Sequence, residues 1–367
     1  MERVASILWD MIPRLVILLL VQQGVTQQKS LPTTALSAEE IVQLQSEAEA
    51  GNAEAQVALG RAFEDGNGVP QSDRQAVKCY RAAAEQGNAT AQNGLGLMLR
   101  SGRGVDQDKA EAVKWYKKAA RQRNLTAMYN LGTAFYNGDG VAIDDIAANA
   151  WFLLAKDLGS QPAVDAVRRM EEQAKNLQPE SFEKIGDMYQ KGDDLPQSYS
   201  DAVAWYRKAA EEGGAPVVQV KLAGLLLQGG PSNYGEAHRL CGKAAQQKYS
   251  PGTCCIGLLS QQGLGVPQDA TQAAKWFDEA ANMGNAPAML RLGEMYWKGE
   301  GVKLNKISAY EFIAMASTAD LPEARREKDR LEKELSPEEL KKGQAKAVEW
   351  ARTHHPLVLR GWSANPN

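Results

Sequence analysis

One serine and lysine pair in the sequence has the spacing of an acyl-transfer nucleophile and its catalytic partner. Ser181 and Lys184 form a Ser-x-x-Lys tetrad, in which the lysine side chain lies within reach of the serine hydroxyl proton. Enzymes that use this tetrad also carry Ser-Asp-Asn and Lys-Thr-Gly motifs, and neither tripeptide occurs in the chain. We therefore expect no catalysis at Ser181, and we predict no catalytic residue elsewhere.

The histidines do not have the pattern of a metal site. His238 stands alone, and His354 and His355 are adjacent near the end of the sequence. No Cys-x2-Cys or His-Glu-x2-His pattern accompanies them, although metal sites need several such ligands at regular spacing. We expect no metal ion and no cofactor.

Three of the four cysteines are close together in the sequence. Cys241 falls on one predicted helix and Cys254 and Cys255 on the next, and two helices joined by a short turn pack antiparallel. The thiols would then be roughly level, so in an exported protein the sequence allows a disulfide from Cys241 to Cys254 or Cys255. The alternative is three buried thiols. Cys79 takes the place that Trp115 has one repeat later, and we expect a small core residue there.

Composition excludes some classes of partner. The 367 residues carry a formal net charge of -3, and no run of lysine and arginine is interleaved with aromatic residues. Proteins that bind nucleic acid usually present such a basic surface. Nucleic acid is therefore not an expected partner, whereas the 44% hydrophobic content is enough to fill contacts between helices.

A dipeptide that recurs every 36 residues determines the expected fold. Leu59-Gly60 returns as Leu95-Gly96 and as Leu131-Gly132. Four further copies bring the total to seven units, marked by Ile185-Gly186, Ala223-Gly224, Ile256-Gly257 and Leu292-Gly293. A unit of this size cannot bury its own apolar face, so it must stack on its neighbours.

Each unit has the pattern of two antiparallel helices, as in residues 91–99 and 112–120 of the second copy. Apolar residues recur at helical spacing in both segments, and the second carries the aromatic pair Trp115-Tyr116. Glycine at position 96 allows a neighbouring helix to approach closely. The fold class predicted is all-α: an α/α superhelix, or solenoid, of about seven helix-turn-helix repeats.

The first residues have the pattern of an export signal. Arg3 and Arg14 precede a seven-residue apolar run, and the small residues Gly24 and Thr26 follow at a suitable cleavage site. The run is too short to cross a bilayer. We expect a signal peptide over residues 1–26, an exported protein, and no stable membrane span after signal removal.

The other boundaries follow from caps, prolines and the repeat period. The stretch after Val164 resembles the stretch after Glu323, and each leads into Leu-x-Pro-Glu, which is typical of a helix start. We expect a change of superhelical direction near residues 160–182, with two shorter grooves meeting there. The predicted segments are a linker (27–36), an N-terminal capping helix that begins with a Ser37/Glu40 capping box (37–52), repeats 1–3 (53–160), an inserted spacer helix (161–179), repeats 4–7 (180–320), C-terminal capping helices (321–353) and a disordered tail (354–367).

The combined pattern Ala-x3-Leu-Gly-x2-Phe/Tyr, Gly-x-Gly-Val and Ala-x2-Trp-Tyr-x-Lys-Ala-Ala resembles the Sel-1-like repeat, a relative of the tetratricopeptide repeat (TPR). Residues 53–160 and 180–316 fit this pattern, and the loops at Gly192-Asp193-Asp194-Leu195 and Gly229-Gly230-Pro231 depart from it. The resemblance implies a right-handed superhelix that acts as an adaptor in secretion, envelope assembly or host contact. The Leu-x-Pro-Glu ending is similar to that of many bacterial members, which favours a bacterial cell envelope.

The resemblance also carries two alternatives. Some cysteine-rich secreted members are described as β-lactamase-like or penicillin-binding, and their helix-clamping disulfides occur in every repeat rather than at one junction. The first alternative is therefore an enzyme acting on β-lactam or cell-wall substrates. The second is a secreted protein that binds envelope polysaccharide.

By analogy with tetratricopeptide arrays, the first helix of each repeat lines a concave surface that binds a protein or peptide partner. Our main hypothesis is a non-catalytic adaptor that uses this groove. Tyr129, Tyr136 and Trp297 are the expected anchors, because aromatic residues dominate binding hot spots. The predicted solvent-facing positions also include Asn93, Arg100, Thr133, Asn137, Glu183, Asp187, Gln190, Lys221, Gln228 and Glu294.

Overall fold

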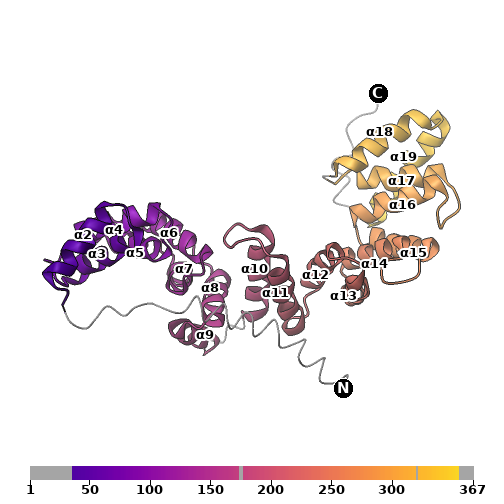
Figure 1. Ribbon diagram of the computed structural model, residues 1–367. Coiled ribbons are helices and arrows are strands. Elements are labelled where there is room, and N and C mark those ends of the chain that lie inside the picture. Colours follow the sequence, from indigo (N-terminus) through magenta and orange to yellow (C-terminus); the bar gives the residue numbers. More distant parts are fainter. Residues whose placement is uncertain (1–34, 173–176, 320, 355–367) are drawn as a thin grey trace, which may run out of the picture. The chain divides into compact units, whose positions relative to one another are not determined.

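Helices make up all the regular structure that the computed structural model describes, over residues 35–172, 177–319 and 321–354 (Figure 1). The all-α prediction is confirmed, and no strand occurs in these ranges. None of the helices described is both long and apolar enough to cross a membrane. The predicted signal peptide, most of the predicted linker and residues 355–367 of the predicted tail lie outside the described residues.

Contacts divide the chain into two compact units, Met1–Trp115 and Tyr116–Asn367. The described part of the first unit holds α2 (Ala38–Glu49), α3 (Ala53–Asp65), α4 (Asp73–Glu85), α5 (Ala89–Ser101) and the start of α6 (Lys109–Arg121). The second unit continues with α7 (Leu125–Asn137), α8 (Asp145–Asp157), α9 (Gln161–Glu172), α10 (Gln178–Lys191), α11 (Tyr199–Glu212), α12 (Pro216–Gln228), the 3-10 turn η1 (Pro231–Asn233), α13 (Tyr234–Gln246), α14 (Ser250–Gln262), α15 (Ala270–Asn282), α16 (Ala286–Lys298), α17 (Lys306–Ala316), α18 (Pro322–Glu334) and α19 (Pro337–His354).

Each repeat consists of a first and a second helix. The first helices are α3, α5, α7, α10, α12, α14 and α16, and the second helices are α4, α6, α8, α11, α13, α15 and α17.

Side-chain caps and glycines set the ends of these helices. An asparagine such as Asn124 precedes several first helices and accepts a hydrogen bond from a backbone N–H of the first turn. A glycine such as Gly138, with φ of 74°, ends them in the left-handed conformation. The predicted capping box at the start of α2 is confirmed: Ser37 Oγ accepts from the Glu40 amide at 3.2 Å, and Glu40 Oε2 accepts from the Ser37 amide at 2.8 Å.

The glycine of the recurring Leu-Gly or Ile-Gly step is where a bulky side chain of the second helix lies against the first, an aromatic ring in repeats 1, 3, 4 and 6 and Ile313 in repeat 7. A Cβ atom at Gly186 would be 2.6 Å from the Tyr206 ring, and one at Gly257 would be 2.7 Å from the Phe277 ring. Tyr206 and Phe277 are fully buried. Only glycine leaves room for the ring at this contact, which explains why the dipeptide recurs with the repeat.

Repeat 5 departs from the register that the sequence indicates. In repeat 5 the pair equivalent to Ile185-Gly186 is Leu222-Ala223. Ala223 is fully buried, as this contact requires. Gly224 is exposed, and a Cβ atom at Gly224 would have nothing within 4 Å. The sequence marker Ala223-Gly224 was therefore wrong by one residue. Alanine fits at this contact because the residue facing it on the second helix is the small Cys241 instead of an aromatic ring.

The extra helix α9 falls where a spacer was predicted. The second helix α8 contacts both α9 and α10, just as α17 contacts both α18 and α19. This parallel agrees with the sequence similarity between the stretches after Val164 and Glu323. Repeat 4 therefore packs directly on repeat 3 through α8 and α10, and α9 lies beside this contact.

Candidate binding surface

The predicted anchors on the first helices differ in exposure. Tyr136 is 38% exposed, and Asn137 beside it is exposed. Tyr129 is half-buried and its ring packs at 5.5 Å from the ring of Phe152 on α8. Tyr136 and Asn137, at the end of α7, are therefore accessible to a partner, as are the exposed Gln190 and Gln228.

Trp297 is held by the protein itself. It packs against the buried core around α16 and α17. Lys306 Nζ lies 5.4 Å from the centre of its ring and Arg330 Cζ lies 5.2 Å from it. These cations stabilise the ring through their attraction to its π face, which gives Trp297 a role in joining α16 to α17 and α18.

The structure contradicts one predicted position. Asn93 is only 8% exposed, so its side chain does not face solvent. It follows Ala91 and Gln92 on the buried side of α5, where both of those side chains are also buried. Arg100 and Glu294 are half-buried, and Glu294 accepts a hydrogen bond from Arg291 at 3.1 Å.

Four of the other predicted surface positions meet in one polar cluster. Lys221 Nζ on α12 lies 2.8 Å from Glu183 Oε1 and 2.7 Å from Asp187 Oδ1, both on α10. The Tyr206 hydroxyl donates to Asp187 at 2.6 Å and is 2.7 Å from Gln190 Oε1. The cluster joins the first helices of repeats 4 and 5, a pairing that the sequence did not indicate.

The electrostatics of this cluster follow from its partial burial. Burial raises the pKa of Tyr206, and its hydrogen bond to the Asp187 carboxylate raises it further. Burial alone would lower the pKa of Lys221, but its hydrogen bonds to Asp187 and Glu183 outweigh that effect, so the pKa is raised. The lysine therefore stays charged, and its ion pairs hold α10 and α12 together.

A similar arrangement occurs in the first unit. The Tyr80 hydroxyl donates to Glu64 Oε2 at 2.8 Å. Arg103 Nη1 lies 3.0 Å from the same carboxylate, and its Nη2 lies 2.6 Å from Asp73. A tyrosine of the second helix thus donates a hydrogen bond to an acidic residue of the first helix in both units.

Ser181 is a structural residue of the interface between α8 and α10. Its side chain is fully buried. Its Oγ accepts a hydrogen bond from Asn149 Nδ2 at 3.1 Å and donates to the Ile146 carbonyl at 3.3 Å. Lys184 is exposed and lies 4.0 Å from Asp144. A hydroxyl without access to solvent cannot attack a substrate, which argues against the enzyme alternative.

We expect Ser181→Ala to lower the free energy of unfolding by about 1–2 kcal/mol, because it leaves the buried Asn149 amide without its partner. Urea unfolding followed by circular dichroism measures this change, with Lys184→Ala as an exposed control that should be nearly neutral. Hydrolysis of nitrocefin by the wild type that disappears in Ser181→Ala would contradict this structural role.

The cysteines form one disulfide. Cys241 on α13 is bonded to Cys255 on α14, with 5.8 Å between their Cα atoms, and this bond joins repeats 5 and 6. Cys254 and Cys79 are free thiols. Burial raises the pKa of the Cys254 thiol to about 11, which makes it unreactive at neutral pH. No group of three or more potential metal ligands occurs within the described ranges.

The disulfide stands where other repeats have a ring contact. Between repeats 4 and 5, Lys221 Nζ lies 5.8 Å from the centre of the Tyr206 ring. Between repeats 5 and 6, Cys241 occupies the position of Tyr206 and Cys255 that of Lys221. A covalent bond thus replaces a non-covalent contact between successive repeats.

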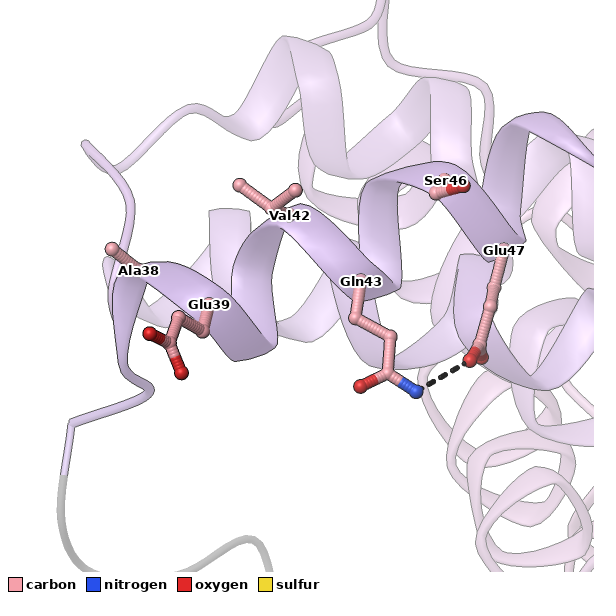
Figure 2. Close-up of a pocket in the computed structure, with 6 residues that line it drawn as sticks. All are labelled: Ala38, Glu39, Val42, Gln43, Ser46 and Glu47. Carbon is pink, nitrogen blue, oxygen red and sulfur yellow. Dashed lines mark hydrogen bonds between the residues drawn. The ribbon is translucent and has the colours of Figure 1, made fainter.

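A depression along α2 is formed by a single helix. Ala38, Glu39, Val42, Gln43, Ser46 and Glu47 line it, and Gln43 donates to Glu47 at 2.9 Å (Figure 2). Val42 is 64% exposed. Since all its lining residues come from α2, the depression is the outer face of this helix and has no opposing wall.

Comparison with known families gives one extensive match. The sequence model described as Sel1 repeat matches seven stretches, at residues 53–88, 89–124, 125–160, 183–214, 216–249, 256–285 and 286–321.

Curated relatives match over shorter stretches. The chain is 32% identical over 97 residues to chitin synthase regulatory factor 3 of Schizosaccharomyces pombe, which covers 25% of this chain and 10% of that protein. It is 28% identical over 147 residues to an uncharacterised protein of Neisseria meningitidis serogroup B, covering 37% and 28% respectively. The chain therefore spans less than a third of the length of these relatives.

Among solved structures, a protective antigen of uropathogenic Escherichia coli with an SLR fold is 24% identical, with coverage of 89% of this chain and 91% of that chain and a TM-score of 0.40. A Sel1 repeat protein from Oxalobacter formigenes is 28% identical, with coverage of 79% and 90% and a TM-score of 0.35.

Proposed function

We propose that this chain, which belongs to the Sel1 repeat family, is a non-catalytic scaffold that binds an extended segment of a partner protein along its first helices. Sel1 repeat proteins generally act in protein–protein interaction, and the family is typically non-enzymatic. The groove and the residues that bind in it are our proposal.

The exposure of Tyr136 is the observation that carries this proposal. Its ring is 38% exposed at the end of α7. The equivalent positions in repeats 1, 2, 4 and 6 are the polar residues Glu64, Arg100, Gln190 and Gln261. Repeat 5 has Leu227 there, and repeat 7 has Trp297, whose ring is covered by Lys306 and Arg330. The repeat pattern therefore does not require an aromatic residue here, and exposed aromatic residues are frequent anchors in protein interfaces.

A photo-crosslinking amino acid at position 136 tests this proposal. It should capture a partner that mass spectrometry can identify, and binding of that purified partner should weaken at least about tenfold in Tyr136→Ala, a hot-spot effect of about 1.4 kcal/mol or more.

Val42→Ala on α2 is the matched control, since it removes an exposed apolar side chain outside the proposed surface. Equal loss of binding in both variants would contradict the assignment to the first helices. Glycan-array binding without any protein partner would favour the polysaccharide alternative instead.

We also propose that the protein is exported to a bacterial cell envelope. The signal-like pattern of residues 1–26 supports export, and so does the disulfide between Cys241 and Cys255, because structural disulfides persist in oxidising compartments. N-terminal sequencing of the mature protein should find residues 1–26 removed. A mature soluble protein that retains these residues would contradict export.

A further inference from the structure

We propose that a cavity between α11, α12 and α13 binds an aromatic side chain of a partner protein, with a carboxylate next to it. The occupant would take the place that the chain's own tryptophan fills one repeat earlier. This second site is separate from the first-helix surface proposed above, and its test does not depend on that surface.

The cavity opens between the second helices of repeats 4 and 5 and has a volume of about 430 Å³. Leu222 on α12 and Leu240 on α13 supply apolar surface. Its other lining residues are polar or small, namely Arg207, Ala210, Glu211, Gln219, Glu236, Arg239 and Lys243. This volume lies within the range of pockets that hold ligands in proteins.

The equivalent place between repeats 3 and 4 is filled. Trp205 is only 7% exposed, and its ring lies 5.5 Å from that of Phe182. Lys208 Nζ lies 3.9 Å from the centre of the Trp205 ring and 3.2 Å from Asp157 Oδ2. The indole ring thus packs against a phenyl ring and against a cation that lies near both rings. An acidic residue of the previous repeat fixes this cation in place.

All four of these residues have counterparts in repeat 5, and all four counterparts line the cavity. At the positions of the two aromatic rings, Leu240 replaces Trp205 and Gln219 replaces Phe182. At the two charged positions, Lys243 is equivalent to Lys208 and Glu211 to Asp157. The cavity exists because leucine and glutamine replace two aromatic rings while the lysine and the acidic residue remain. Lys243 therefore lacks the ring that its counterpart covers.

Hydrogen bonds hold the Gln219 side chain in place, so it cannot turn inward and fill the cavity. Its Nε2 donates to the Gly214 carbonyl at 2.9 Å, and its Oε1 accepts from Gln247 Nε2 at 3.3 Å. The side chain is 4% exposed. Because these bonds hold the amide in place, the cavity is preformed, which lowers the entropic cost of binding.

The charges at the cavity select the chemistry of the occupant. Arg207 is neutralised by Glu236, with 2.8 Å between Nη2 and Oε2. The charge of Arg239 also acts on Glu236 and, together with Arg207, lowers the pKa of that carboxyl group. Three cations, Arg207, Arg239 and Lys243, and two carboxylates, Glu211 and Glu236, thus line the cavity and leave it with a net positive charge. Lys243 is placed to cover an incoming ring, and the net positive charge of the lining favours a carboxylate beside that ring.

Two short peptides test this inference by fluorescence anisotropy: labelled acetyl-Gly-Asp-Trp-Gly-amide and the same peptide with alanine for tryptophan. We expect the tryptophan peptide to bind wild-type protein at least about tenfold more tightly than the alanine peptide.

Leu240→Trp should abolish this difference while the thermal midpoint stays equal or rises, because it fills the cavity as Trp205 does in repeat 4. Lys243→Gln should weaken binding by about twofold to fivefold, the effect of one exposed cation–π contact. The matched control Lys208→Gln, at the site already filled by Trp205, should leave the affinity unchanged.

The inference is overturned if the tryptophan peptide binds no better than the alanine peptide, or if Leu240→Trp or Lys243→Gln binds like the wild type. Crosslinking at position 136 is measured separately. A crosslinked partner together with a failed peptide test would refute only the cavity, and peptide binding without a partner at position 136 would refute only the first-helix surface.

Discussion

Gly186→Ala is expected to lower the free energy of unfolding by about 1–3 kcal/mol, whereas Gly224→Ala should leave it unchanged or raise it by up to about 1 kcal/mol. The two glycines lie on neighbouring first helices, α10 and α12. Alanine improves helix propensity equally at both, so the difference between the variants isolates packing.

Packing explains the opposite signs. The new Cβ at position 186 would be 2.6 Å from the buried Tyr206 ring, so the ring or the helix must shift. At position 224 nothing lies within 4 Å. Urea unfolding monitored by circular dichroism gives both values. Equal stability of the two variants would show that Tyr206 does not pack on Gly186 and would refute the corrected register of repeat 5.

Cys255→Ser is expected to lower the free energy of unfolding under oxidising conditions by about 3 kcal/mol. The bonded cysteines are 14 residues apart, and a cross-link that closes a loop of this length restricts the unfolded chain by about that amount. Dithiothreitol should destabilise the wild type by a similar amount and leave Cys255→Ser unchanged. Cys254→Ala is the matched control and should keep the response to dithiothreitol, because Cys254 is a free thiol.

Alkylation gives an independent measurement of the same bond. Under denaturing, non-reducing conditions, mass spectrometry should find two labelled cysteines, Cys79 and Cys254. Four labelled cysteines in protein purified from the envelope would contradict the bond between Cys241 and Cys255. So would a Cys254→Ala variant whose free energy of unfolding does not change when dithiothreitol is added.

Much of the fold could be predicted from spacing because the same packing contact between two helices recurs in seven repeats. The Leu-Gly step at Gly132 or Gly186 records a contact with a ring, and the Ser37/Glu40 pair records a capping box. Both signals act over short distances along the sequence. The register failed only in repeat 5, where Ala223 and Gly224 are adjacent small residues and the ring that would distinguish them is absent.

The candidate sites were less predictable because exposure depends on neighbours that are distant in sequence. Asn93 lies on a helix whose polar residues were taken as solvent-facing, yet the packing of α5 buries it. Ser181 matched a catalytic tetrad, but Asn149 on α8, 32 residues earlier, binds its hydroxyl. Neither outcome is visible in the local pattern.

The sequence alone determined that this protein is an all-α array of stacked repeats, because the period of its small and aromatic residues requires that packing. Tertiary structure decided which of two adjacent cysteines bonds to Cys241, because successive residues on a helix face different directions and α14 turns Cys255 toward α13. It also decided that Leu240 leaves a cavity, since the loss of a tryptophan creates space only where the surrounding helices do not close on it.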